Sequence, residues 1–368
     1  MTNYIIEDYR GLTEFKGCSF NNIKNTEIKK ELIKCLIENN IDQSLYWCVE
    51  ILSSCNFILL WEIFFYMMTN IINVSNIKFI LFLDKKYDIF KEIINNCKNE
   101  EDVLKLRNNI KIRNLFCDII ILICKSDKDY ILDYKKINIK NFSFENMNNY
   151  LKAPNIRFVN DYFKDNDPKE LYIILNEFLY NLSENNNLEC CKWIYIYVNY
   201  YSLCKKNKNI LLCENRDNID LDDDLNKNLK QHPIWIIWSI LFDKSKNYFF
   251  LNKYIKILYN FFKIQISISK IKTRLNLLFL SISLYVQRDS NDIFNKSIVK
   301  DKTDFLKLSE IARNSLDNIC KKVNSIYKNN PENKSKIIKN DKKNKISISF
   351  DKIKSLDNFM LNKNNDTN

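Results

Sequence analysis

Only two glycines, Gly11 and Gly17, occur in this chain of 368 residues, and both precede the first segment with helical periodicity. Phosphate-binding loops and nucleophile turns need glycine, because it tolerates a positive φ and lets the backbone approach a ligand closely. P-loops, dinucleotide fingerprints, kinase glycine loops and nucleophile elbows are therefore missing from the sequence. Abundant Asn, Lys and Ile indicate an AT-rich genome, which lowers the glycine content without removing a glycine that chemistry requires.

Apolar residues recur at helical spacing in one segment after another. Leu45, Cys48, Val49 and Leu52 follow the i, i+3, i+4, i+7 pattern of a helix with one buried face. Asp167-Pro168 with Glu170 has the pattern of an N-cap, first helical residue and capping box ahead of a long apolar stripe. No strand–turn–strand signal occurs. The sequence predicts an all-α protein, an irregular α-solenoid-like array of antiparallel helices without a clean repeat.

Two polar stretches, 127–142 and 214–230, interrupt this pattern and mark weak boundaries. The last stretch of the chain is low in complexity and rich in Lys and Asn, which is typical of disorder. We expect five parts: an irregular N-terminal segment 1–24, an N-terminal helical subdomain 25–126, a C-terminal helical subdomain 143–289, a peripheral helix 303–328 and a disordered basic tail 329–368.

No basic or apolar leader opens the chain, and its twelve cysteines are scattered, mostly along apolar faces. Such thiols behave as small hydrophobes, so we expect a reducing compartment and a chain that is not secreted. The apolar run 57–68 contains Glu62 and is shorter than the roughly 20 residues of a membrane span. The sequence predicts a cytoplasmic protein without a membrane span.

Cysteines and carboxylates are numerous, but none has the spacing of a recognised metal or active site. Adjacent Cys190 and Cys191 lack the paired spacing of a zinc site, and buried thiols are the favoured interpretation. The acidic run that begins at Asp220 is similar to the start of a calcium-binding loop, but it lacks the glycine and the final glutamate of such a loop. A solvated loop is therefore favoured. The single histidine, His232, precedes Pro233 at a helix start and is expected to cap a helix or lie at the surface. We predict no catalytic residue, no cofactor and no metal, although a carboxylate pair that meets only in three dimensions stays open.

The net charge of +12 suits an acidic partner. Where codon bias supplies Lys, an Arg is more plausibly retained for its planar fork, although ion pairing to nearby carboxylates is the favoured alternative. The tail could bind phosphates through counterion release, against the alternative of a solvated disordered segment. The candidate contacts to nucleic acid or a protein partner are Arg107, Arg113, Lys152, Arg157, Lys336, Lys339, Lys342, Lys343 and Lys345.

Several segments between about Ile33 and Val286 together resemble a family of uncharacterised all-helical proteins of large, AT-rich DNA viruses of protists and algae. The resemblance implies a lineage and no particular activity. The shorter run SLYWCVEIL, with the following LLWEIF, is similar to the helical C-terminal part of clamp-loader-like ATPases, which implies an oligomerising helical module without ATP hydrolysis. The segments that carry the first resemblance are DQSLYWCVEILSSCNFILLWEIFFYMM (42–68), LRNNIKIRNLFCDIIILICKS (106–126), YLKAPN (150–155), DPKELYIILNEFLYNLS (167–183), CKWIYIYVNYYSLCKK (191–206) and PIWIIWSIL (233–241).

Three functions follow as hypotheses. The first is a non-enzymatic helical interaction or scaffold protein of a large DNA virus, located in the host cytoplasm or the virion, which binds other proteins through helical faces and which could also self-associate. The second is an accessory factor in viral replication or transcription that binds nucleic acid through a basic patch and the tail. The third is an enzyme that uses paired carboxylates.

Overall fold

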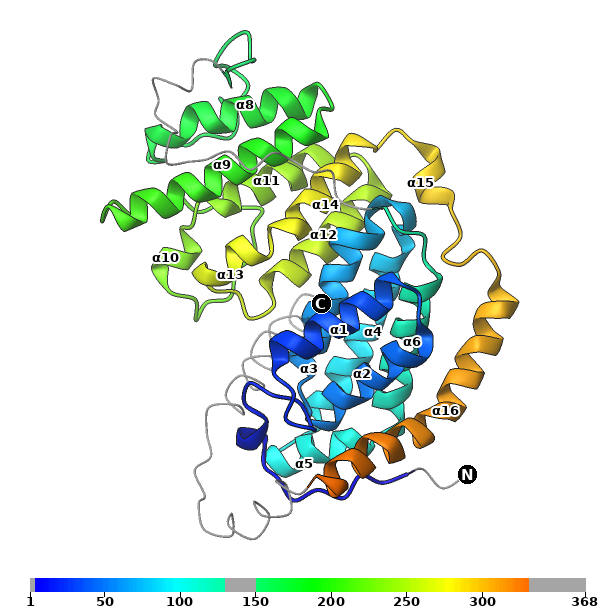
Figure 1. The fold of residues 1–368 in the computed structure, drawn as a ribbon. Helices are drawn as coiled ribbons and strands as arrows, with labels where there is room; N and C mark the ends of the chain where they lie inside the picture. The colour runs from blue at the N-terminus through cyan, green and yellow to red at the C-terminus, as the bar shows by residue number, and fades with distance from the viewer. Residues whose placement is uncertain (1–3, 130–149, 331–368) are drawn as a thin grey trace, which may run out of the picture. The chain divides into compact units, whose positions relative to one another are not determined.

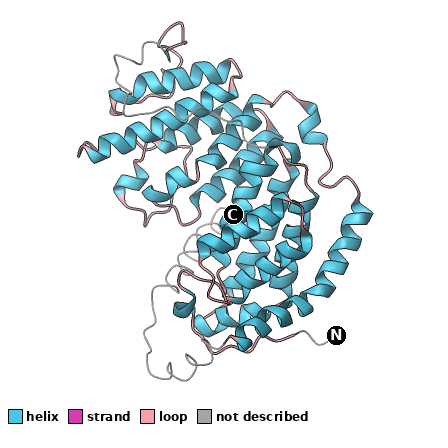
Figure 2. Ribbon diagram, in the orientation of Figure 1, coloured by secondary structure: helices cyan, strands magenta, loops and turns pink. Residues whose placement is uncertain are grey.

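The computed structural model describes residues 4–129 and 150–330. Helices and the loops between them make up these residues, which contain no β-strand and only one isolated bridge, between Cys18 and Lys24 (Figure 2). The predicted all-α class is confirmed. The described residues divide into two compact units, unit 1 (4–129 with 296–330) and unit 2 (150–295), and each unit is described by itself.

Unit 1 combines consecutive helices from the first third of the chain with one long helix from the end of the described residues (Figure 1). Neighbouring helices are joined by short turns, and α2 and α6 both pack against the last helix. A π-helix, Met67–Ile72, extends α3. The α-helices are α1 (Asn25–Ile37), α2 (Ile41–Ser53), α3 (Phe57–Tyr66), α4 (Lys78–Asn95), α5 (Glu100–Lys105), α6 (Ile110–Lys125) and α16 (Lys302–Asn329).

The centre of unit 1 is an aromatic cluster around α3. Trp61 lies with its ring centroid 5.5 Å from that of Phe90 and 5.9 Å from that of Phe116, with both pairs of rings tilted. With its extension, the stretch Phe57–Asn76 is long and apolar enough to cross a bilayer by length and composition, and 61% of its most apolar window is buried inside the fold. Burial of this kind is usual for the central helix of a folded unit, so the stretch gives no clear membrane span.

Helix α16 belongs to the body of unit 1. The sequence predicts a peripheral helix over 303–328, which is more polar than the other helices. The structure instead packs α16 against α2 and α6 through one apolar stripe, which includes Leu316, Cys320 and Val323. The polar residues lie on the opposite face, so the helix is amphipathic and its polar composition does not place it outside the core.

Unit 2 has its own core, in which α11, α12 and α14 pack together and α8 packs on α9. Trp235 and Trp238 of α11 contact the ring of Phe262 with centroid separations of 5.9 and 5.3 Å. The α-helices are α8 (Tyr172–Ser183), α9 (Asn187–Lys206), α10 (Lys227–Lys230), α11 (Ile234–Ser245), α12 (Phe249–Lys263), α13 (Ile268–Thr273), α14 (Leu275–Val286) and α15 (Asn291–Asn295).

Asparagine performs the roles that glycine and serine usually perform at helix ends. The side chains of Asn40 and Asn186 accept hydrogen bonds from Gln43 N and Glu189 N, at the starts of α2 and α9. Asn39 and Asn185, which follow α1 and α8, have positive φ angles of 58° and 54°. Asn tolerates the left-handed region better than other residues with a Cβ, which explains how helices end cleanly in a chain with two glycines.

Candidate functional site

Two of the predicted contact residues, Arg107 and Arg113, are buried inside unit 1, with only 2% and 1% of their surface exposed. Arg107 Nη1 lies 3.0 Å from Asp8 Oδ2, and Arg113 Nη1 donates to the Tyr4 carbonyl at 2.8 Å. The prediction of a surface contact at these positions is wrong. The arginines hold the irregular N-terminal segment on the helices, which is the ion-pairing alternative that the sequence left open.

The other two predicted contact residues within the described part of the chain are Lys152 and Arg157. Both lie in unit 2 and are exposed. Lys152 Nζ is 3.4 Å from Glu189 Oε1, whereas Arg157 forms no ion pair with any described residue. The four positions therefore do not form one basic patch. Lys336, Lys339, Lys342, Lys343 and Lys345 lie outside the described residues, and the prediction of a disordered tail falls there too, apart from its first two residues.

Two buried polar residues of α8 fix the segment 150–160, which precedes the helix. The Glu177 carboxylate accepts hydrogen bonds from Lys152 N at 2.9 Å and Ala153 N at 3.0 Å. Asn176 accepts from Phe158 N at 3.0 Å and donates to the Asn155 carbonyl at 2.8 Å. Buried polar side chains need hydrogen-bond partners, and Asn176 and Glu177 find theirs in the backbone of this segment, which they hold in one conformation.

Asp167 fixes the next part of the same segment. Its carboxylate accepts from Lys164 N at 2.9 Å and Glu214 N at 3.0 Å and forms a buried ion pair with Arg216. The predicted capping box at Asp167 is therefore wrong. A short 3-10 helix, Lys169–Leu171, precedes α8, and the Asp167 carboxylate accepts no backbone hydrogen bond from the start of either helix. The stretch 214–230, expected to be a solvated acidic loop, contributes the buried Arg216.

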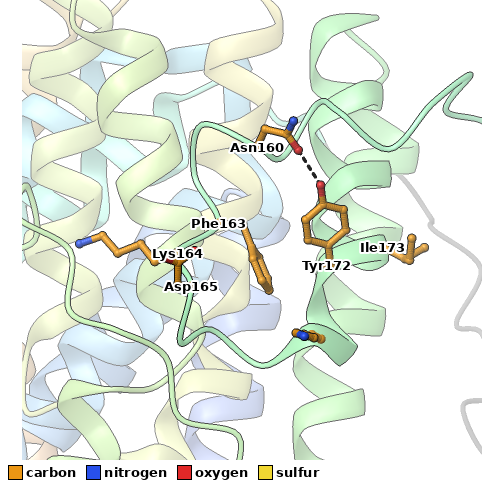
Figure 3. A pocket seen from close by; sticks show the side chains of 7 residues that line it. Asn160, Phe163, Lys164, Asp165, Tyr172 and Ile173 are labelled. Atoms are coloured by element: carbon orange, nitrogen blue, oxygen red, sulfur yellow. Dashed lines mark hydrogen bonds between the residues drawn. The ribbon is translucent and has the colours of Figure 1, made fainter.

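A pocket of about 540 Å³ opens beside the first turn of α8, against this fixed segment (Figure 3). One side is aromatic: the rings of Phe163 and Tyr172 meet edge to face at 4.9 Å, and the Tyr172 hydroxyl bonds to Asn160 Oδ1 at 2.6 Å. The lining also includes three charged residues, Lys164, Asp165 and Lys169. The lining residues are Asn160, Phe163, Lys164, Asp165, Lys169, Tyr172 and Ile173.

The two lysines of the pocket are in different states. Lys164 Nζ donates to the Asn215 carbonyl at 2.9 Å and lies 3.8 Å from Asp217 Oδ2. Lys169 is exposed and forms no ion pair within the part of the chain that the structure describes. With Asp165 counted, the lining has a net charge of one positive unit, so the pocket can receive an anionic group beside an apolar or aromatic one.

The remaining chemical candidates lie in the core. His232 is buried and its Nδ1 accepts from Ile234 N at 3.0 Å, so it caps the start of α11 and the predicted alternative of a surface position is wrong. Burial lowers the pKa of His232 to about 3, so its imidazole is neutral near pH 7. Burial also raises the pKa of the Cys191 thiol to about 12. Among residues 4–129 and 150–330, no group of three or more His, Cys, Asp or Glu side chains could hold a metal ion.

The acidic run that begins at Asp220 is fixed to α12. The Asp220 carbonyl accepts from the Tyr259 hydroxyl at 2.6 Å and from Lys263 Nζ at 2.9 Å. Lys263 Nζ also lies 3.4 Å from Asp220 Oδ2, so the first carboxylate of the acidic run already faces a cation of the chain itself.

Comparison with known protein families, with curated proteins and with solved structures finds no match to this chain. The resemblance to helical proteins of large DNA viruses and the shorter similarity to clamp-loader-like ATPases stay predictions.

Proposed function

We propose that this chain is a non-enzymatic helical binding protein, and that the pocket beside α8 receives an anionic group carried by a partner protein. One observation carries the proposal: buried side chains fix a segment that lines the pocket, while Lys169 in the same pocket remains exposed and without an ion pair to a described residue. Asp167 accepts from Lys164 N of the lining, and Asn176 and Glu177 hold residues 152–158, which lead to Asn160. A fixed wall lowers the entropy cost of binding, and a cation without a partner offers a new charge-assisted hydrogen bond.

The pocket lining supports binding better than turnover. It contains two lysines, one aspartate, one asparagine, two aromatic rings and an isoleucine, with no thiol or imidazole among these described residues. A general base or a nucleophile needs a second group that activates it within hydrogen-bond reach, and Asp165 has no hydrogen bond or ion pair with another described side chain. With the resemblance stated above, the proposal extends to a scaffold or adaptor of a large DNA virus in the host cytoplasm or virion.

Affinity purification with a charge-reversed pocket tests this function. Lys169→Glu keeps the fold, because the side chain is exposed, and it should remove the partners that the pocket binds. Lys206→Glu, an exposed lysine at the end of α9, is the matched control. We expect at least one protein that co-purifies with the parent chain and the control to fall tenfold or more with Lys169→Glu. Identical sets of co-purified proteins from all three chains would contradict the proposal.

Nucleic acid is a second candidate partner, favoured by Arg157. This exposed arginine has no ion pair with a described residue, and its segment leads directly to Asn160 and Phe163 of the pocket. Cations next to aromatic rings are typical of surfaces that bind single strands. The test is fluorescence anisotropy with a labelled single-stranded oligonucleotide: binding that weakens with salt and with Arg157→Glu would support this candidate, and no binding at low salt would remove it.

A further inference from the structure

Two consecutive phenylalanines project from the start of α12. Phe249 and Phe250 are 78% and 66% exposed, whereas large apolar side chains elsewhere in unit 2 are mostly buried. Their rings contact each other edge to face, with centroids 5.5 Å apart and planes at 76°. The opposite face of the same helix, which includes Ile255, Leu258 and Phe262, is fully buried. Helix α12 is therefore held by the core with its aromatic pair directed outward.

Lysines continue the exposed face of α12. Lys253 and Lys256 follow Phe249 by four and seven residues, a spacing that puts the three side chains on one face of a helix. Both lysines are exposed, and neither forms an ion pair with a described residue. Before the helix, Lys246 is 2.8 Å from Asp243 Oδ1, and Asp243 also accepts a hydrogen bond from the Tyr162 hydroxyl. The nearby carboxylate is thus already engaged, and the face is positive.

We propose that this face of α12 binds the surface of an anionic phospholipid bilayer. Phe249 and Phe250 enter the boundary between headgroups and acyl chains, and Lys253 and Lys256 contact lipid phosphates and carboxylates. Exposed aromatic rings beside lysines supply the two contributions that bind a protein to an anionic interface, which are buried apolar area and electrostatic attraction. Each lysine near an anionic surface strengthens binding by about fivefold.

The geometry favours a bilayer over other anionic partners. The two rings protrude, so a folded protein would need a matching cavity for them, whereas a fluid interface needs none. Rings at 76° to each other present no pair of parallel faces, so they do not offer a stacking platform for two successive bases of a single strand. The proposal concerns a helix that contributes no side chain to the pocket beside α8, so either proposal can fail alone.

Vesicle flotation with the full chain tests the proposal. Vesicles of phosphatidylcholine alone are compared with vesicles that also contain phosphatidylserine, at low and at raised salt. We expect binding only to the anionic vesicles, weakened by salt. Phe249→Ala with Phe250→Ala should weaken it at least tenfold, and Lys253→Ala with Lys256→Ala should weaken it by about fivefold for each lysine.

The matched control replaces two exposed apolar residues of α16, Leu306→Ala with Ile311→Ala, and should bind as the parent chain does. Circular dichroism checks that each variant keeps its helices. We expect no loss of helix, because all the substituted side chains are exposed. Three results would overturn the proposal. They are no binding to anionic vesicles, equal binding by the phenylalanine variant, and a dimer of the parent chain that the phenylalanine substitutions dissociate in the absence of vesicle binding. Equal binding by the phenylalanine variant would assign vesicle binding to lysines elsewhere in the chain, including those of the tail.

Discussion

Arg107 Nη1 lies 3.0 Å from Oδ2 of Asp8, although 99 residues separate them in the sequence, and both side chains are 3% exposed. A second guanidinium, that of Arg10, is 2.9 Å from the same carboxylate oxygen. The guanidinium carbon of Arg10, Cζ, also lies 3.6 Å from the ring centroid of Tyr327 on α16. The buried Asp8 carboxylate thus joins the N-terminal segment to the turn before α6. Arg107, which the sequence predicts as a partner contact, is part of the core of unit 1.

Removing this carboxylate should strongly destabilise the protein. In Asp8→Ala the buried guanidinium of Arg107 and the partly buried one of Arg10 lose their counter-charge. Breaking a buried pair in this way costs about 3–5 kcal/mol. Chemical denaturation monitored by circular dichroism measures the loss. Glu101→Gln, which breaks an exposed pair with Lys105, is the control and should leave the midpoint unchanged. A midpoint for Asp8→Ala within error of the parent would show that the ion pair does not stabilise the fold.

Glu177→Ala should release the segment before α8. The backbone N–H groups of Lys152 and Ala153 lose their acceptor, and a hydrogen bond to a charged group contributes about 1.5–3 kcal/mol. Limited trypsin digestion should then cut faster after Lys152 and Arg157, and mass spectrometry identifies the sites. Glu184→Ala, at the other end of α8 and exposed, should leave the cleavage rate as it was. Equal rates in both variants would mean that Glu177 does not hold the segment.

His232 makes stability depend on pH. Burial lowers its folded pKa to about 3, below the ordinary value of about 6.5 in the unfolded chain, so the unfolded chain binds the proton first as pH falls. The contribution of the neutral His232 to the free energy of unfolding is therefore fully present above pH 6.5. It is lost as pH falls towards 3, by up to about 1.4 kcal/mol per pH unit. His232→Asn removes this titration, so the stability of the parent relative to the variant should fall by about 2 kcal/mol from pH 7 to pH 5. A difference that stays constant over this range would contradict a buried neutral imidazole.

Lys208 should be a site where glycine stabilises the protein. Its φ of 62° lies in the left-handed region, after the end of α9, and a residue with a Cβ is strained there by about 1–2 kcal/mol. Lys208→Gly should raise the free energy of unfolding by up to about 1 kcal/mol, less than the strain because glycine also gains entropy in the unfolded chain. Lys206→Gly, inside the last turn of α9, should lower it instead. Changes of the same sign in both variants would show that backbone strain at Lys208 is not the cause.

Helix faces could be predicted from the sequence because their signal is local. Leu45, Cys48, Val49 and Leu52 were placed on one face by spacing alone, and all four are buried in α2. Asp167 could not be placed by spacing, since its partner Arg216 is 49 residues away and a local capping pattern competed with it. A cap is decided by neighbours in sequence, whereas a buried ion pair is decided by packing.

The segment that leads to the pocket is held by two residues that are not among the predicted contacts. Asn176 and Glu177 interrupt the apolar pattern of α8, and both are buried because the segment 150–160 folds over them. A polar pair in the middle of an otherwise apolar helix is the signal that could have found them. Of the predicted contacts within the described residues, Arg157 lies in the segment next to the pocket, and Lys152 is exposed but paired with Glu189.

Site-specific photo-crosslinking tests the binding role of the pocket most directly. A photoreactive phenylalanine analogue is placed at Ile173, which lines the pocket, or at Glu184, at the far end of α8, and the full chain is irradiated in the cells that produce it. The binding function predicts a covalent adduct with a partner protein from position 173, none from position 184, and loss of the adduct when Lys169→Glu is added. The same adducts from both positions, or an adduct at position 173 that Lys169→Glu leaves unchanged, would contradict it.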